Sequence, residues 1–140
     1  MDAAHYLTGR TGQSGQVSFQ TDSALDLPFE DGRFDVVFLQ HVAMNISDRA
    51  RLCREIRRVL KSGGRLATFD VVLISGEPDF PLPWARTPAT SFLLTAPATR
   101  KAIVSAGLAW QDDIEAAKAW IAQLRASGMQ CAERRSTPCE

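Results

Sequence analysis

The sequence predicts an α/β protein built on a parallel sheet, and three observations support that prediction. A short apolar run at residues 36–39 is rich in β-branched and aromatic side chains, which is typical of a strand buried on both faces of a parallel sheet. An amphipathic helical pattern follows this run, and a second apolar run covers residues 66–72. A strand, a helix and a strand with short links form a βαβ unit, whose crossover is right-handed in almost all proteins.

The predicted helix of this unit has one apolar face and one charged face. Ser47 or Asp48 can cap its start, and Gly63 lies where the end of a helix favours a left-handed residue. The apolar face comprises Leu52, Cys53, Ile56, Val59 and Leu60. The opposite face carries Arg51, Arg54, Glu55, Arg57 and Arg58. We interpret this basic cluster as the solvated face of a helix and not as a nucleic-acid site.

Length and charge limit the classes of function. A chain of 140 residues fits one domain, and its 16 basic side chains balance 16 acidic ones. A neutral chain gives no electrostatic reason to expect a nucleic acid or an anionic membrane as a partner. No apolar run approaches the roughly 20 residues of a membrane span, and the opening MDAAHYLTGR lacks the apolar core of a signal peptide. The expected compartment is therefore the cytoplasm.

The three cysteines do not predict a metal site. They are odd in number, and no two of them form a CxxC pair. Cys53 falls on the apolar face of the predicted helix, where packing accounts for it. Cys131 and Cys139 lie in a polar tail, and we expect both to be reduced thiols.

The N-terminal part of the chain predicts a short helix, a turn and a strand. Asp2 can cap a helix over residues 3–7, which the glycines of GRTGQSG then end. This glycine-rich segment lacks both the GK[ST] ending of a P-loop and the spacing of a dinucleotide loop, so we interpret it as a turn. Residues 17–21 alternate in polarity and predict a further strand.

The C-terminal half predicts a proline-rich segment and then helices. Residues 74–88 contain four prolines with Phe80 and Trp84 among them, which fits either a lid over a ligand or a surface loop pinned by two buried rings. A helix is predicted from Thr95 or Ala96 to Gly107, and another from residue 112 or 113 to about residue 127. We expect a single domain over residues 1–128 and a disordered tail over residues 129–140.

Polar residues follow each of the three predicted strands. Asp22 ends the first, Gln40 and His41 end the second, and Asp70 falls near the end of the third. Taken singly, an Asp at such a place can form a turn and a His can be a packing residue. Because ligands bind at the carboxyl ends of parallel strands, the group together indicates a candidate ligand site at one edge of the sheet.

These residues resemble the class I S-adenosylmethionine-dependent methyltransferases. The segment DSALDLPFEDGRFDVVFLQHV, followed by LCREIRRVLKSGGRLATFD, is similar to the later half of the family pattern, with Ser62 in place of the usual proline. The resemblance implies a partial Rossmann-like sheet with flanking helices. It also implies that the family's N-terminal strands and glycine-rich loop precede the part that this chain matches. The segments QHVAMNI, FPLPWA and SFLLT resemble, more narrowly, the sarcosine/dimethylglycine N-methyltransferases.

The resemblance implies a cofactor, S-adenosyl-L-methionine, and a set of residues that would hold it. Asp22 would accept a hydrogen bond from the adenine amino group, Ser23 and Ala24 would present backbone to the ring, and Leu25 would pack on its face. Gln40 and His41 would lie beside the sulfonium. Asn45 and Trp84 would lie near a small-molecule methyl acceptor. No residue is assigned as a catalytic acid or base, because methyl transfer from a sulfonium depends mainly on alignment.

Two functions of different class follow from this sequence. The chain is expected either to methylate a small molecule, such as a glycine-derived amine, or to be a non-catalytic remnant that serves as an oligomeric interaction module. In the family sheet the strands that this chain lacks lie between those at residues 17–21 and 34–40. We therefore expect these two strands to pair directly, or a second copy to fill the gap in a homo-oligomer or strand-exchanged dimer.

Overall fold

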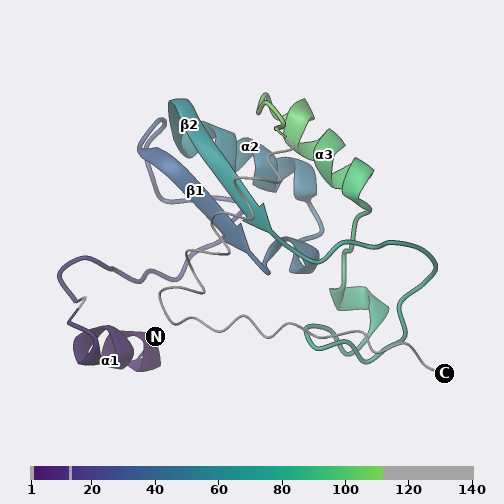
Figure 1. Ribbon diagram of the computed structural model, residues 1–140, viewed down its shortest axis with the longest axis horizontal. Helices are drawn as coiled ribbons and strands as arrows, with labels where there is room; N and C mark the ends of the chain where they lie inside the picture. The colour runs from purple at the N-terminus through teal and green to yellow at the C-terminus, as the bar shows by residue number, and fades with distance from the viewer. Residues whose placement is uncertain (1, 13, 112–140) are drawn as a thin grey trace. The chain divides into compact units, whose positions relative to one another are not determined.

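The computed structural model describes residues 2–12 and 14–111 (Figure 1). The helices and strands are α1 (Asp2–Arg10), β1 (Phe34–Gln40), α2 (Arg49–Val59), β2 (Leu60–Phe69) and α3 (Ala96–Ser105), with short 3₁₀ helices η1 (Ala43–Asn45) and η2 (Pro88–Thr90). All of them lie in Met1–Ala109, the first of the chain's two compact units. None of the helices in the described residues is both long enough and apolar enough to cross a membrane.

The predicted βαβ unit is present. Strands β1 and β2 are parallel neighbours, with Val37 opposite Leu66 and Gln40 opposite Phe69. Helix α2 connects them, and the side chain of Asp48 caps its start by accepting a hydrogen bond from the backbone N–H of Arg51 at 2.9 Å. The α/β fold class and the partial Rossmann-like sheet are thereby confirmed.

The junction between α2 and β2 is tighter than the sequence predicted. Leu60, which we expected on the helix face, is the C-terminal cap of α2 and the first residue of β2. Gly63 does have a left-handed φ of 76°, but it lies within β2 and not directly after the helix. At Gly64 a Cβ would lie 3.0 Å from the carbonyl oxygen of Lys61 and 3.2 Å from that of Asp35. The second glycine therefore allows the chain to turn closely against β1.

One face of the sheet is covered by the two longer helices. Leu52 and Ile56 of α2 are almost fully buried and form a core cluster with Ala43 and Leu60. Sheet residues Val37, Leu39 and Leu66 pack against this core cluster. Cys53 is buried on the same face of α2, as predicted, and is a free thiol. Helix α3 adds its own buried residue, Ile103.

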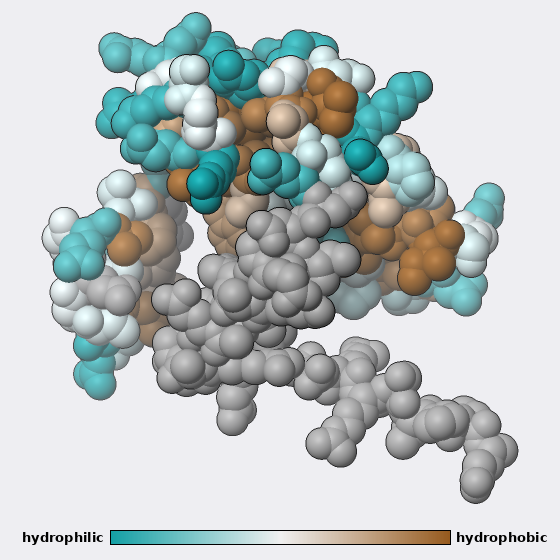
Figure 2. Space-filling model, turned by 45° about the horizontal axis from the view of Figure 1, so that its top comes forward, coloured by the Kyte–Doolittle hydropathy of each residue, from teal (hydrophilic) through white to brown (hydrophobic). Residues whose placement is uncertain are grey.

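The other face of the sheet is open in the described residues. Val36 is 58% exposed, Phe38 44% and Phe69 43%. The prediction that the first apolar run is buried on both faces is therefore wrong. Alternate residues of that run face α2, while the others reach the surface, and Figure 2 shows hydrophobic side chains reaching the surface among polar ones. An apolar run indicates that a strand can be covered on both sides, but the covering layer must come from other segments.

The strand predicted at residues 17–21 is also absent from the structure. This segment is irregular, and its residue Phe19 packs edge-on against His5 of α1, with ring centroids 5.2 Å apart. The predicted direct pairing with β1 is therefore wrong, since the described sheet has two strands. A strand needs a neighbour to satisfy its backbone, and alternation in the sequence does not supply one. Exchange with a second copy stays a prediction.

The remaining predictions divide between confirmed and undescribed segments. Helix α1 is longer than expected and includes Gly9, and the turn predicted after it contains Gly12 with φ of 70°. In α3 the hydroxyl of Thr95 accepts a hydrogen bond from the backbone N–H of Ala98, and Gly107 follows the helix with φ of 83°. The helix predicted after residue 112 and the tail at residues 129–140 lie outside the described residues.

Candidate functional site

The carboxyl edge of the two parallel strands brings together three of the predicted polar residues. Gln40 and Phe69 are partners in the register, so the two strands end at the same level. The backbone N–H of His41 donates to the carbonyl of Phe69 at 2.9 Å, and Asp70 follows directly. The side chains of Gln40 and His41 are exposed at this edge. The edge therefore offers polar groups where parallel sheets bind ligands.

The loop after β1 has an unusual backbone conformation. His41 has φ of 50°, and among the described residues it is the one non-glycine in the left-handed region. The 3₁₀ helix η1 follows, and its residues Ala43 and Met44 are buried while Asn45 is exposed. The loop is thus anchored by two buried side chains and presents His41 and Asn45 to the solvent.

Asp70 is half-buried, and its carboxylate is hydrogen-bonded to the protein backbone. Its Oδ2 accepts a hydrogen bond from the backbone N–H of Ala43 at 2.6 Å, and its Oδ1 accepts one from Val71 at 2.9 Å. The sequence placed Asp70 at the ligand-binding edge but left its direction open. The structure shows that its carboxylate fixes the loop after β1.

The segment predicted to hold a nucleoside ring lies against α2. The hydroxyl of Ser23 accepts a hydrogen bond from the backbone N–H of Leu25, which closes a local turn. Ala24 and Leu25 are half-buried and pack against the core cluster, and Arg51 of α2 donates through Nε to the carbonyl of Leu25 at 2.8 Å. Asp22 is exposed in the irregular stretch just before the turn. The segment is therefore tied to the helix that starts at the same edge as His41.

Two charged residues of α2 clamp the next part of this segment. The carboxylate of Glu55 accepts from the backbone N–H of Leu27, and Arg58 donates to the carbonyls of Leu27 and Phe29 at 2.9 and 2.7 Å. Glu55 and Arg58 also bind each other at 2.8 Å. The hydrogen bond from Arg58, with further help from Leu27, lowers the pKa of Glu55 to about 2. The helical pattern places this pair on a solvated face, whereas in the structure the pair holds a segment that lies about thirty residues earlier.

The proline-rich segment is irregular, as predicted, and the residues that flank it on either side meet. The backbone N–H of Leu73 donates to the carbonyl of Leu94 at 3.0 Å, and Leu73 also forms an isolated parallel bridge with Thr95. Residues 74–93 therefore form a loop that is closed at its base, starts just after β2 and ends at α3.

Trp84 lies within this segment and is held by its far end. Its indole Nε1 donates to the hydroxyl of Ser91 at 3.2 Å, and the ring is half-buried. The next residue, Phe92, donates its backbone N–H to the carbonyl of Met44 at 2.8 Å. Trp84 is thus hydrogen-bonded to Ser91, whose neighbour Phe92 contacts the loop that carries Asn45. These contacts fit either of the two interpretations of the segment, a lid or a pinned loop.

Arg49 is a residue that the sequence analysis missed. Its Nη2 donates to the carbonyl of Phe92 at 3.2 Å, while its buried Nε has no hydrogen-bond partner in the described part of the chain. Burial lowers the pKa of Arg49, and the nearby charge of Asp70 opposes that shift. The missed signal is helical spacing, because position 49 falls on the same face as Leu52 and Ile56.

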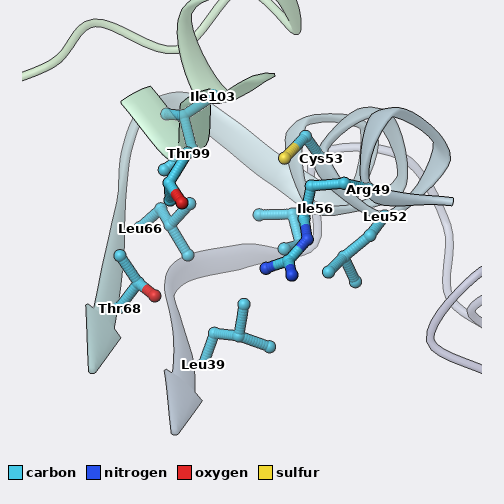
Figure 3. Close-up of a pocket in the computed structure, with 9 residues that line it drawn as sticks. All are labelled: Leu39, Arg49, Leu52, Cys53, Ile56, Leu66, Thr68, Thr99 and Ile103. Carbon is cyan, nitrogen blue, oxygen red and sulfur yellow. The ribbon is translucent and has the colours of Figure 1, made fainter. Parts of the chain in front are cut away.

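Arg49 borders a small hollow between the sheet and the two helices. Figure 3 shows its guanidinium pointing from α2 toward Leu39 and Thr68 of the strands. The lining is mostly apolar and consists of Leu39, Arg49, Leu52, Cys53, Ile56, Leu66, Thr68, Thr99 and Ile103. This hollow lies inside the packed layer, and so we place the candidate site at the open edge and not here.

Comparisons with known proteins bear on what this edge does. Residues 2–75, more than half of the chain, match the family described as methyltransferase domain. The O-methyltransferase resE of Aspergillus sclerotiorum is 40% identical over 73 residues, which are 52% of this chain and 28% of resE. The ajmaline N-methyltransferase of Rauvolfia serpentina is 36% identical over 63 residues, which are 45% of this chain and 22% of that enzyme.

A solved structure shows the same fold. The [4+2]-cyclase SpnF is 29% identical, and the alignment covers 76% of this chain and 37% of SpnF with a TM-score of 0.64. This chain therefore spans less than a third of the two methyltransferases and little more than a third of SpnF. The family match covers the helix α1, the candidate edge and the βαβ unit. On this match, the chain belongs to the methyltransferase domain family.

Proposed function

We propose that this chain takes part in S-adenosylmethionine-dependent methyl transfer to a small-molecule acceptor, such as a glycine-derived amine, in the cytoplasm. One observation carries the proposal. The exposed residues Gln40 and His41 end a parallel strand at the edge where α2 begins, and α2 in turn fixes the segment after Asp22 through Arg51. A nucleoside ligand needs such a fixed edge with backbone and polar groups around it.

The residues after Asp22 suit the adenosine end of the cofactor. Asp22 has an exposed carboxylate that can accept a hydrogen bond from an exocyclic amino group. Ser23 and Ala24 belong to a turn in which Ser23 is exposed, and Leu25 offers a half-buried apolar side chain. Because α2 holds this turn, the chain would not need to order it when the ligand binds, which favours affinity.

Gln40 and His41 suit the reacting end. S-adenosylmethionine, when bound, supplies a methyl group that a nucleophile takes in line as the carbon–sulfur electron pair returns to sulfur. The chain would contribute alignment by presenting Gln40 and His41 from a loop whose backbone is fixed on both sides. No proton acceptor is needed in the chain when the acceptor is an unprotonated tertiary amine, since no N–H proton is released and the positive charge passes from sulfur to nitrogen.

Asn45 and Trp84 suit the acceptor. Asn45 is exposed beside the buried Met44, and Trp84 belongs to the segment that contacts Met44 through Phe92. An aromatic face close to a quaternary ammonium contributes about 1–2 kcal/mol when the pair is desolvated. This supports an amine as acceptor, while the relatives' names include both an O- and an N-methyltransferase. The acceptor atom is therefore part of the proposal.

The first experiment is a calorimetric titration of the full chain with S-adenosylhomocysteine. We expect the wild type to bind and Asp22→Ala to lose about tenfold or more in affinity, as befits one hydrogen bond to a carboxylate. Asp26→Ala is the matched control, because Asp26 is an exposed carboxylate of the same turn that has no assigned role. Binding that is equal in the Asp22 and Asp26 variants would remove Asp22 from the site.

The second experiment measures methyl transfer directly. The chain is incubated with methyl-labelled S-adenosylmethionine and with sarcosine, dimethylglycine or a phenol, and label in each product is counted. Transfer to the amines that falls at least tenfold in Trp84→Ala, with transfer to the phenol absent, is the expected result. Transfer to the phenol alone would contradict the amine acceptor but keep the reaction class.

The alternative function is a non-catalytic interaction module. It is favoured by the exposed side chains of Val36 and Phe69 on the outer face of the sheet, and by the fact that β1 has one strand partner in the described sheet. A fold of this kind does not fix the reaction, as the similar fold of a cyclase illustrates. Absence of heat in the titration with millimolar ligand, together with a homo-oligomer or strand-exchanged dimer in sedimentation velocity, would support this alternative and contradict cofactor binding.

A further inference from the structure

The loop that carries His41 needs something to hold it. A left-handed backbone is unfavourable for a residue with a Cβ, because that atom approaches the following carbonyl oxygen. His41 nevertheless has φ of 50°, and it lies between an ordinary strand and the buried residues Ala43 and Met44. The surrounding structure must therefore impose this conformation.

Two hydrogen bonds fix the loop on either side of Val42. The backbone N–H of His41 donates to the carbonyl of Phe69, which continues the pairing of β1 with β2. The backbone N–H of Ala43 then donates to Oδ2 of Asp70 at 2.6 Å. A hydrogen bond to a carboxylate is stronger than one between neutral groups, and this one is short. The reversal of the chain at His41 lies between these two attachments.

The carboxylate of Asp70 is itself held in place. Its second oxygen accepts the backbone N–H of Val71, so that each oxygen has one backbone donor. Arg49 lies close enough to attract it and is attached to the carbonyl of Phe92. Phe92 in turn donates to the carbonyl of Met44, the residue after Ala43. The loop is therefore held from two sides, by Asp70 and by Phe92, and Arg49 links these two residues.

We propose that Asp70 is a positioning residue, which holds the loop of residues 41–45 so that His41 faces the candidate cofactor site in its left-handed conformation. This inference rests on the proposed function for the identity of the ligand. It assigns no contact between Asp70 and the ligand, and the role of the carboxylate is to accept the backbone N–H groups of Ala43 and Val71. Asp70 acts through the backbone of Ala43, one residue beyond Val42.

The test compares Asp70→Ala and Asp70→Asn with the wild-type chain. Alanine removes both acceptors, whereas asparagine keeps one acceptor oxygen of nearly the same shape. Asp35→Asn is the matched control, because Asp35 belongs to the same sheet but binds Lys61 near the opposite end of β1. Each protein is titrated with S-adenosylhomocysteine, and its backbone chemical shifts at His41 and Ala43 are recorded by NMR.

We expect Asp70→Ala to weaken binding about tenfold or more, Asp70→Asn to recover part of that loss, and Asp35→Asn to bind as the wild type does. In Asp70→Ala the amide proton of Ala43 should move upfield, and the carbon shifts of His41 should lose their left-handed signature. A general loss of stability would not produce this graded recovery with a local change of shift.

Two results would overturn the inference: unchanged His41 shifts in a folded Asp70→Ala, or Asp70→Ala binding as tightly as the wild type. Should Asp70→Ala fail to fold, the same two comparisons are made with Asp70→Asn. Failure of the wild type to bind S-adenosylhomocysteine would contradict the proposed function instead. In that case the NMR comparison still decides whether Asp70 holds the loop.

Discussion

The two faces of the β1–β2 sheet are built from the same kinds of residue and have different surroundings. On one face, Val37 and Leu39 pack against α2, whose residue Leu52 is 1% exposed. On the other face, Val36 and Phe38 remain about half exposed. Neighbouring residues of one strand thus differ in burial because the helices lie on one side.

An apolar sequence and actual burial are therefore separate properties. A strand that is apolar on both sides can be covered on both sides, but its own sequence does not provide the second cover. The covered face should therefore account for most of the folding free energy, and the open face for little of it. Substitutions on the two faces test this contrast.

The largest effect is expected on the covered face. Leu52→Ala should lower the free energy of unfolding by about 2–5 kcal/mol, because it leaves a cavity beneath the sheet. Urea denaturation followed by circular dichroism measures this change. The matched variant is Phe38→Ala, which removes a larger side chain from the open face and should cost clearly less. Equal losses in the two variants would show that the open face is covered in solution.

The second effect concerns the clamp on α2 and depends on pH. The pKa of Glu55 is about 2 in the folded chain and about 4.5 in its ordinary state, so the folded chain binds its proton less readily. Its stabilising contribution is complete above about pH 4.5 and is lost as the pH falls from there toward 2. Glu55→Gln should therefore flatten the dependence of stability on pH within this window.

The measurement is urea denaturation at a series of pH values for Glu55→Gln, the wild type and Asp35→Asn. Asp35 pairs with Lys61 through an 80% exposed side chain, and so its removal should alter the profile little. A wild-type profile that is retained in Glu55→Gln would show that the clamp does not contribute to acid sensitivity.

The third effect is the loss of a helix cap. Asp48→Ala removes the acceptor for the backbone N–H of Arg51 at the start of α2, and should cost about 1 kcal/mol. Thr95→Ala does the same at α3, where the hydrogen bond to Ala98 is longer at 3.3 Å. We expect the α2 variant to lose more, as measured by thermal and urea denaturation. The opposite order would contradict the expectation that the shorter hydrogen bond contributes more.

The smallest effect is expected on the open face itself. Val36→Thr keeps the shape of the side chain and should change the free energy of unfolding by no more than about 0.5 kcal/mol, at any protein concentration. Denaturation at two concentrations tests this. A larger loss in Val36→Thr, together with a wild-type stability that rises with protein concentration, would instead indicate that a second copy covers this face.

Much of the fold could be predicted from the sequence because it depends on local patterns. The helix of the βαβ unit follows from the spacing of its apolar residues and from Asp48, and α3 follows from Thr95 and Gly107. The strand at residues 17–21 could not be judged in this way, since a strand depends on a neighbour that its own alternation does not identify. The same reason explains why the exposure of Val36 was missed.

The position of the candidate site could be predicted, but the tertiary contacts that hold its residues could not. The meeting of Gln40, His41 and Asp70 follows from the parallel arrangement of two strands, which the short links already imply. The direction of Asp70 and the inward face of Arg49 depend on tertiary contacts with Ala43 and Phe92. Contacts of this kind join residues 27 and 43 positions apart, and no local pattern records them.

The closed base of the proline-rich segment has a consequence for how such chains diversify. Because Leu73 meets Leu94 and Thr95, insertions, deletions or a transplanted sequence between them would leave the start of α3 where it is. The part of the segment that contains Trp84 can therefore vary, while the contact that closes its base stays the same. New preferences for the methyl acceptor could then arise by changes within this segment alone, without changes to the sheet.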